Sequence, residues 1–228
     1  LVAPASGNLF GDALESIQRH SKEQLGLQTD RPIIVVGHQP TIFHPGILAK
    51  FIAGDLIARK VGGILVHLVV DHHIGDVCAI EVPFIENGVL HVVKKQIANI
   101  DSTISLNDQG RLTPTGEVEF LNDALKHATG GNASMQIANT MNTIMAPYAK
   151  VDACIASTNL LQSEIGKKLL QAMESNPASC IQNYNDAVKQ FPNSGISELQ
   201  ENELPIWTGS RNEPASNRDK DLRPRALL

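Results

Sequence analysis

Two continuous apolar runs with an amphipathic stretch between them dominate the first third of the chain. The runs 33–36 and 64–70 are rich in β-branched residues and do not alternate with polar positions, which is typical of strands covered on both faces. Between them, apolar residues recur at helical spacing over 47–57, and Pro45 stands where a first helical turn tolerates proline. The order strand, helix, strand with short joints predicts a right-handed crossover unit whose two strands are parallel.

Further elements follow from spacing and turn residues. Residues 8–26 carry apolar positions at helical spacing and end at Gly26, which predicts an amphipathic helix before the first strand. After the second strand, the runs 77–84 and 89–93 flank Asn87-Gly88, a strong hairpin signal, so we expect the sheet to acquire an antiparallel ribbon. Helical periodicity then governs most of the chain, over 118–125, 135–148, 154–173 and 181–191.

These elements predict an α/β fold class, namely a Rossmann-like, mostly parallel sheet with an antiparallel hairpin and a helical insertion. We expect the core with its N-terminal helix and hairpin over residues 1–110 and the helical insertion over 111–203. A return strand near Trp207 and a truncated tail occupy 204–228. An apolar segment begins at the very end of the chain, after Pro224, which favours an N-terminal portion of a longer protein.

Composition narrows the function classes. At 228 residues with 42% hydrophobic residues, the chain can bury a proper core. Its net charge of -5, its 4% aromatic content and the lack of a basic stretch interleaved with aromatics argue against a nucleic-acid surface. The longest apolar run is far shorter than a membrane span, and Cys78, Cys154 and Cys180 are too dispersed for a disulfide framework or a metal knuckle. We therefore expect a cytoplasmic protein that binds neither a membrane nor nucleic acid.

The first candidate segment is the joint from the first strand into the following helix. It holds Gly37, His38, Gln39, His44 and Gly46. A helix start offers unpaired N–H groups and the positive end of the helix dipole, which favour a phosphate or carboxylate, and imidazoles add further donors. In outline this resembles the His-containing signature with which adenylate-forming nucleotidyltransferases hold ATP phosphates. The alternative is that the glycines permit a tight turn and the histidines make local hydrogen bonds.

The second candidate segment follows the second strand and holds Asp71, His72, His73 and Asp76. Its carboxylates and imidazoles suit a divalent metal such as Mn or Zn, and Asp-His-His is similar to the signature letters of the two-metal DHH phosphoesterases. They equally suit general acid–base chemistry or recognition of a substrate amine, with Asp71 orienting a His that titrates near neutrality. A third interpretation makes Asp71 a cap of the next turn, with His72 and His73 solvated.

Both segments leave the carboxyl ends of neighbouring parallel strands, which is where open α/β sheets bind ligands. We therefore predict one site at this edge of the sheet, with Asp71, His72 and His44 as its catalytic residues. The predicted residues that bind substrate or phosphate are Gly37, His38, Gln39, Gly46, His73 and Asp76. No residue is assigned to a metal. His67 lies within an apolar strand and is interpreted as a core histidine.

Taken together, the two segments resemble the cysteine-adding enzymes of bacillithiol biosynthesis. In that family a strand ends in T-G-Q-Q-x-G-L-F-x-G-P-L, and the next strand ends in E-D-H-D-x-x-E. The matching positions in this chain are Gly37, Gln39, Phe43 and Ile47 in the first motif, Asp71, His72 and Asp76 in the second, and the later segment Leu222-Arg223-Pro224. The resemblance implies a Rossmann-like nucleotidyltransferase-type core with helical insertions in a longer chain.

From the residues and this resemblance we expect a ligase- or transferase-like enzyme that joins a small amine or amino acid to an acceptor, with ATP and Mg as the expected cofactors. Two alternatives stay open: a metal-dependent phosphoesterase that uses the Asp-His-His cluster, and a non-catalytic metabolite-binding domain. The expected partners are a small-molecule substrate and the C-terminal remainder of the same protein, with a homo-oligomer as a further option.

Overall fold

The structure, a computed structural model, describes residues 7–9, 11–27, 29–41, 45–193 and 197–200. The chain divides into two compact units, residues 1–163 and 164–228. Among the described helices, none is long and apolar enough to cross a membrane. The first unit contains the parallel sheet, the hairpin and the strand ends on which the candidate site was predicted.

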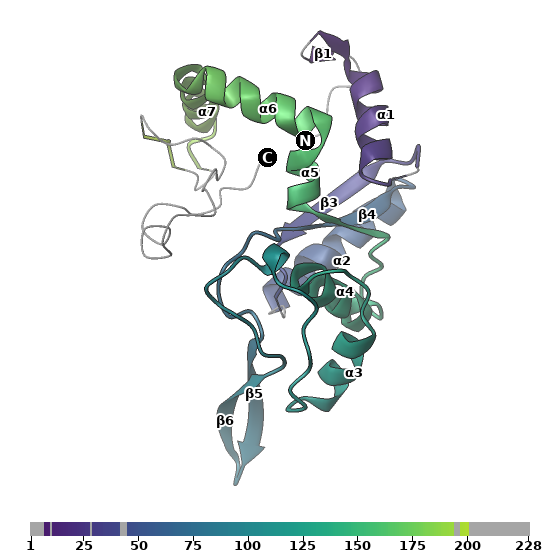
Figure 1. The fold of residues 1–228 in the computed structure, drawn as a ribbon, viewed down its shortest axis with the longest axis vertical. Helices are drawn as coiled ribbons and strands as arrows, with labels where there is room; N and C mark the ends of the chain where they lie inside the picture. The colour runs from purple at the N-terminus through teal and green to yellow at the C-terminus, as the bar shows by residue number, and fades with distance from the viewer. Residues whose placement is uncertain (1–6, 10, 28, 42–44, 194–196, 201–228) are drawn as a thin grey trace. The chain divides into compact units, whose positions relative to one another are not determined.

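A three-stranded parallel sheet lies at the centre of the first unit (Figure 1). Its strands are β3 (Ile33–His38), β4 (Ile64–Val69) and β7 (Ala153–Ala156), with β4 in the middle. β3 pairs in parallel with β4 over its whole length, and helix α2 (Pro45–Lys60) connects the two strands. The predicted α/β class and the parallel strand–helix–strand unit are confirmed.

The third strand corrects the prediction for the helical part of the chain. A continuous helix was expected over 154–173, but the structure has β7, then α5 (Ser157–Gln162), then α6 (Glu164–Ser175). The run Ala-Cys-Ile-Ala is as short as one helical turn, so its periodicity does not distinguish helix from strand. Strand pairing determines that this run is a strand, because the backbone of β7 pairs with β4 over Val66–Val69.

Side chains of β4 alternate between two covered faces of the sheet. On one face Leu65 joins a cluster with Phe51 of α2 and Met145 at the end of α4 (Ala133–Met145). On the other face Val66 packs with Leu27, which follows helix α1 (Leu14–Gln24). Because both faces are covered, the strand is apolar at almost every position, as its sequence indicated.

The N-terminal helix is shorter than predicted. A helix was expected from residue 8, but β1 (Asn8–Leu9) and β2 (Asp12–Ala13) form a small antiparallel ribbon before α1 begins at Leu14. Gly11 lies between them with φ of 85°, a left-handed conformation that glycine adopts without strain. At the other end, Gly26 has φ of 70° directly after the helix, as expected for a C-terminal glycine cap.

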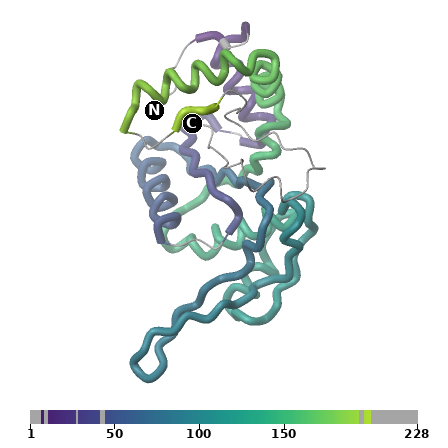
Figure 2. The backbone as a smooth tube through the Cα atoms, turned by 90° about the vertical axis from the view of Figure 1, so that its left-hand side faces the viewer, coloured from purple at the N-terminus to yellow at the C-terminus, as the bar shows by residue number. Residues whose placement is uncertain are grey.

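The hairpin is confirmed, but it does not join the parallel sheet. Strands β5 (Ala79–Glu86) and β6 (Val89–Gln96) form a separate two-stranded sheet, which extends as an arm from the first unit (Figure 2). The expectation that the parallel sheet acquires this ribbon was wrong. The base of the arm is held instead by Asp76, whose Oδ1 accepts hydrogen bonds from the Cys78 and Ala79 N–H groups and from Gln96 Nε2.

A second apolar core supports the base of this arm. It combines residues next to β5 and β6 with residues of the 3-10 helix η1 (Leu106–Asp108), of α3 (Glu119–His127) and of α4. Its fully buried members include Cys78, Ile97, Leu106, Leu125 and Ile137. The segment between β4 and β7 is therefore a packed subassembly of its own.

The second unit contains α6 and α7 (Pro177–Gln190). Asn176 caps α7, since its side chain accepts from the Ser179 N–H, and Pro177 occupies the first helical turn. Asn185 of α7 holds Leu199 through hydrogen bonds to both its N–H and its C=O. The predicted return strand near Trp207 and the segment 222–224 lie outside the described residues.

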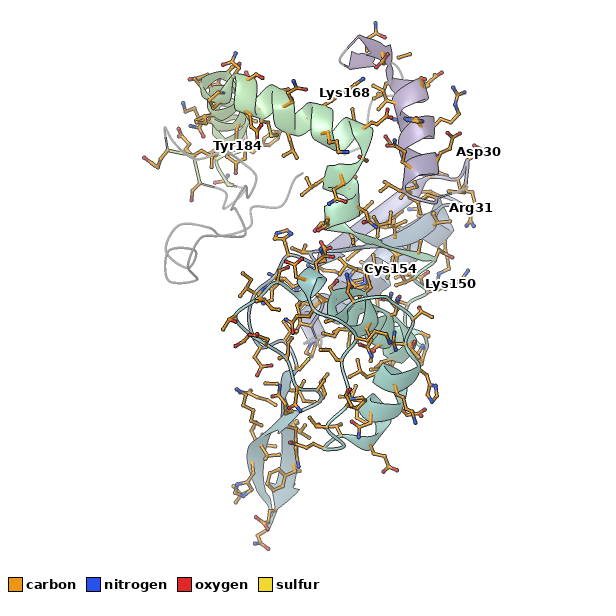
Figure 3. All side chains as sticks on the ribbon, in the orientation of Figure 1. Asp30, Arg31, Lys150, Cys154, Lys168 and Tyr184 are labelled. Carbon is orange, nitrogen blue, oxygen red and sulfur yellow. The ribbon has the colours of Figure 1, made fainter. Side chains whose placement is uncertain are left out.

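Charged side chains connect the segments at the amino ends of β3, β4 and β7. Arg31 donates to the carbonyls of Gly62 and Gly63 just before β4, and Asp152, next to β7, accepts from the Leu65 N–H at 2.9 Å. Lys150 pairs with Asp152 at 2.8 Å; Figure 3 labels Arg31 and Lys150 on their segments. One ion pair and three hydrogen bonds to backbone groups therefore hold these segments together.

Gly54 lets α2 lie directly on the sheet, which yields a prediction. A Cβ at this position would meet Val36 Cγ2 at 2.8 Å and Leu65 Cδ1 at 2.9 Å. We expect Gly54→Leu to destabilise the protein by about 1–3 kcal/mol because a well-packed contact is overfilled. Urea unfolding measures the effect. Ala53→Leu, at an exposed position of the same helix, is the control and should change stability by less than about 0.5 kcal/mol.

Candidate functional site

Three strand ends converge at the carboxyl edge of the parallel sheet. His38 is the last residue of β3, Asp71 and His72 follow β4, and Ser157 follows β7 as the first residue of α5. The parallel pairing of β3 and β7 on either side of β4 places these ends at one edge. The structure thus brings part of the predicted residue set together and adds a serine to it.

Asp71 is the centre of this edge. Its side chain is completely buried, and its Oδ1 accepts from Ser157 Oγ at 2.6 Å and from the Thr158 N–H at 3.0 Å. Its backbone C=O accepts from the Asn107 N–H at 2.9 Å and from Ser105 Oγ. Its other carboxylate oxygen, Oδ2, is buried and has no hydrogen-bond donor among the residues that the structure describes. The Oδ1 atom therefore has a structural role. The Oδ2 atom can still accept a hydrogen bond, from a donor that the described residues do not supply.

Ser157 connects Asp71 to His72 and thereby selects a tautomer. A carboxylate only accepts, so the Ser157 hydroxyl hydrogen goes to Asp71 Oδ1. The Ser157 oxygen then has only lone pairs left for the Asp71 N–H at 3.4 Å and for His72 Nδ1 at 3.2 Å. His72 Nδ1 must accordingly carry the hydrogen of the neutral ring, which makes Nε2 the basic nitrogen.

Burial keeps two histidines of this edge, His72 and His73, neutral. It lowers the pKa of His72, and the nearby Asp71 carboxylate acts in the opposite direction without reversing the shift. It also lowers the pKa of His73, with further contributions from His72 and His38. The electrostatic coupling of His73 to residues from two strand ends indicates that His38, His72 and His73 share one environment. At neutral pH the rings of His72 and His73 are therefore mostly unprotonated and able to accept a proton.

His67 lies beneath this edge, inside the core. Its ring contacts Phe51 edge to face with centroids 4.8 Å apart, and its Nδ1 lies 3.2 Å from Asn142 Oδ1. Burial lowers its pKa to about 4, although the Asn142 hydrogen bond raises it and His38 lowers it slightly further. The Asn142 amide also donates to Cys154 Sγ, so it links α4 to both β4 and β7. The prediction of a core histidine fits this environment.

The remaining predicted residues occupy several different places. Gly37 lies in β3 against Leu68 of the neighbouring strand, Gln39 follows β3 and is half-buried, and Gly46 is exposed in the first turn of α2. Asp76 serves the base of the hairpin through the three hydrogen bonds described above. His44, predicted as catalytic, lies outside the described residues.

The geometry favours neither a metal centre nor a thiol nucleophile. Among the described residues, no group of three or more His, Cys, Asp and Glu side chains is placed to hold a metal ion. Burial raises the pKa of Cys78 to about 12, with help from Asp76, and that of Cys154 to about 11. Both thiols are therefore fully protonated and unreactive at neutral pH.

Two polar residues of this region were missed in the sequence. Ser157 and Thr158 follow β7, whose four residues Ala153–Ala156 include a single β-branched residue and give no local strand signal. The segment was assigned to the interior of a helix, where a serine has no special role. Recognising β7 as the third parallel strand would have placed Ser157 at the same edge as Asp71.

Fold and site together define an α/β protein with a parallel sheet and a polar, His-rich cluster at the carboxyl edge of that sheet. Comparison with protein-family models, with curated proteins and with solved structures found no match to this chain. The resemblance to the bacillithiol enzymes therefore stays a prediction from the residues that carry it.

The Ser157 network predicts the protonation of His72. In long-range proton–nitrogen NMR spectra, we expect His72 to show the Nδ1–H tautomer and a pKa below 6.5. Ser157→Ala should remove the tautomer preference and destabilise the protein by about 1–3 kcal/mol, because buried hydrogen-bond partners lose their bonds. Ser157→Thr retains the hydroxyl and should restore the tautomer. A wild-type spectrum with the proton on Nε2 would contradict the assignment.

The lowered pKa of His67 predicts that the protein loses stability in acid. Its pKa of about 4 in the folded state lies below the value of 6.5 for the unfolded chain, so the unfolded chain binds more protons between these pH values. Stability conferred by the neutral ring is complete above pH 6.5 and should fall by about 3 kcal/mol as the pH is lowered to 4. His72 and His73 act in the same direction.

Denaturant unfolding at several pH values measures this dependence. His67→Gln should reduce the slope between pH 4 and 6.5, and the slope that remains comes from His72 and His73. An equal slope in His67→Gln and the wild type would show that another group causes the acid sensitivity.

Proposed function

We propose that this chain is a ligase- or transferase-type enzyme that joins a small amine or amino acid to an acceptor at the carboxyl edge of β3, β4 and β7. The observation that carries the proposal is the buried Asp71 carboxylate. Its Oδ1 is satisfied by Ser157 and Thr158, while its Oδ2 lacks a donor among the described residues.

An ammonium group is the ligand chemistry that best complements this oxygen. A buried carboxylate oxygen without a donor costs free energy, and a charged donor both neutralises it and makes a short, strong hydrogen bond. Such a group comes from a primary amine or from the α-amino group of an amino acid. The residues packed around Asp71 must move apart for the amine to reach Oδ2, because this atom is buried in the structure.

His72 supplies the base that this reaction needs. An ammonium ion has no lone pair, so it must lose a proton before its nitrogen can attack. In the proposed step, His72 Nε2 accepts that proton, and the nitrogen lone pair forms a bond to the carbonyl carbon or phosphorus of the acceptor. The bond to the leaving group breaks, and the leaving group departs with its electron pair and takes up the second proton that the nitrogen loses. A neutral imidazole is required for this role, and burial provides it.

The acceptor side of the proposal is built on the first predicted segment. His38 lies at the end of β3 within the electrostatic environment of His73, and α2 begins with its first-turn N–H groups next to Gly46. These groups suit a phosphate or carboxylate on the acceptor. A ligase would draw its energy from ATP with Mg, whereas a transferase would use an acceptor that is already activated.

The competing phosphoesterase mechanism needs a metal bound by Asp71, His72, His73 and His38. Asp71 Oδ1 is already committed to Ser157 and Thr158, and the described residues form no group of metal-ligand geometry. Metal analysis of the purified protein separates the two mechanisms, since stoichiometric Mn or Zn would favour the phosphoesterase.

The test is a calorimetric titration of the full chain with amino acids and small primary amines, each with and without ATP and Mg. We expect amines to bind and their N-acetyl analogues not to bind, because acetylation removes the charge that Asp71 complements. Asp71→Asn should weaken amine binding by about 10- to 100-fold, as expected for loss of a charged hydrogen bond. His72→Gln should bind amines within about threefold of the wild type but form no product.

His127→Gln is the matched control and should behave as the wild type, because this residue is exposed on α3. NMR spectra establish that each variant is folded before it is titrated. If no amine binds to the folded wild type, or if Asp71→Asn binds amines as tightly as the wild type, the proposed function is wrong.

A further inference from the structure

The hairpin arm exposes apolar side chains on both of its faces. On one face Phe84 and Val89 are exposed, and on the other face Ile85, Leu90 and Val92 are 75%, 68% and 58% exposed. A two-stranded hairpin is marginally stable by itself in water, and three or more strands are usually needed for independent stability. The exposed arm therefore offers apolar surface that a further strand would cover.

The turn determines which backbone groups of the arm point outward. Asn87 and Gly88 have φ of 51° and 78°, as in a two-residue type I′ turn, so Glu86 and Val89 form the first hydrogen-bonded pair. Pairs alternate along an antiparallel ribbon, which makes Pro83–Val92 a pair without mutual hydrogen bonds. This agrees with Pro83, which has no N–H to donate to the opposite strand.

The two edges of the arm consequently differ. The outward positions of β5 include Pro83, which removes a donor and disfavours pairing with a further strand. The outward positions of β6 are Leu90, Val92 and Lys94, each with both an N–H and a C=O. The next outward N–H, that of Gln96, is already bonded to Glu117 Oε2 at 3.1 Å. With respect to the residues that the structure describes, the edge of β6 is thus open at Leu90, Val92 and Lys94.

From this asymmetry we infer that two copies of this chain associate through the β6 edges of their arms, forming a four-stranded antiparallel sheet around a two-fold axis. Val92 lies opposite Val92 of the second copy, and Leu90 lies opposite Lys94 of the second copy. This register uses all three open positions of each strand and joins the copies by six backbone hydrogen bonds, two for each of three residue pairs. The inference is independent of the proposed function.

Charge complementarity supports a second copy of this chain as the partner, and it supports the antiparallel direction of the two β6 strands. In the antiparallel register Lys95 lies opposite Val89 of the second copy. Within that copy Val89 pairs with Glu86 of β5, so Lys95, Val89 and Glu86 lie on the same face of three adjacent strands. The long side chains of Lys95 and Glu86 can meet across Val89, and symmetry forms this pair twice. No two like charges face each other, whereas a parallel arrangement would bring Lys94 and Lys95 of both copies together.

The oligomeric state of the full chain tests the inference. Sedimentation equilibrium and light scattering should show a dimer that dissociates on dilution. Val92→Pro removes the N–H at the two-fold axis and should raise the dissociation constant by at least about tenfold. Ile85→Pro is the matched control, because it removes an outward N–H from β5, and it should leave the dimer intact.

A charge swap tests the register. Glu86→Lys and Lys95→Glu should each weaken the dimer, and the double variant should restore it. NMR spectra establish that the arm is folded in every variant. A monomeric wild type at all concentrations, equal dissociation by Val92→Pro and Ile85→Pro, or failure of the double variant to restore the dimer would overturn the inference.

Discussion

The buried Asp71 carboxylate is the constraint on which the carboxyl edge of the sheet depends. It follows β4, and through Oδ1 it binds the first two residues after β7, while its backbone carbonyl holds the segment at Ser105 and Asn107. A charge without solvent is tolerated only where hydrogen bonds compensate it. The carboxylate therefore forces Ser157 and Thr158 into a defined position, and this position in turn orients His72. The same hydrogen bonds therefore hold the strand ends together and fix the tautomer of His72.

The histidines illustrate how burial changes the chemistry of a residue type. Exposed imidazoles titrate near pH 6.5, but His67, His72 and His73 all have lowered pKa values because desolvation disfavours the imidazolium ion. For His67 the result is a neutral core residue between Phe51 and Asn142. For His72 the result is a base with a defined tautomer at the edge of the sheet. Proximity to a carboxylate alone would have produced the opposite shift.

The arm between β4 and β7 shows a different balance of forces. Its base is anchored by Asp76 and by the second apolar core, but its outer half exposes valine, isoleucine, leucine and phenylalanine. Pro83 disfavours pairing of a further strand with β5, whereas the edge of β6 can pair with one. The proposed ligand site and the proposed association surface thus lie on different parts of the first unit, the parallel sheet and the arm.

Local sequence determined the elements whose signals are short-range. The apolar runs of β3 and β4 indicated strands covered on both faces, Asn87-Gly88 determined the hairpin turn, and Gly26 marked the end of α1, because each depends on backbone conformation or on periodicity within a few residues. The same runs predicted a candidate site at the ends of β3 and β4. Tertiary structure alone decided that Ala153–Ala156 is a strand, since its pairing partner lies more than 80 residues earlier in the chain. For the same reason only the fold could place Ser157 on Asp71, direct Asp76 to the hairpin base and keep the hairpin out of the parallel sheet. These outcomes depend on long-range hydrogen bonds and on burial, which no local pattern encodes.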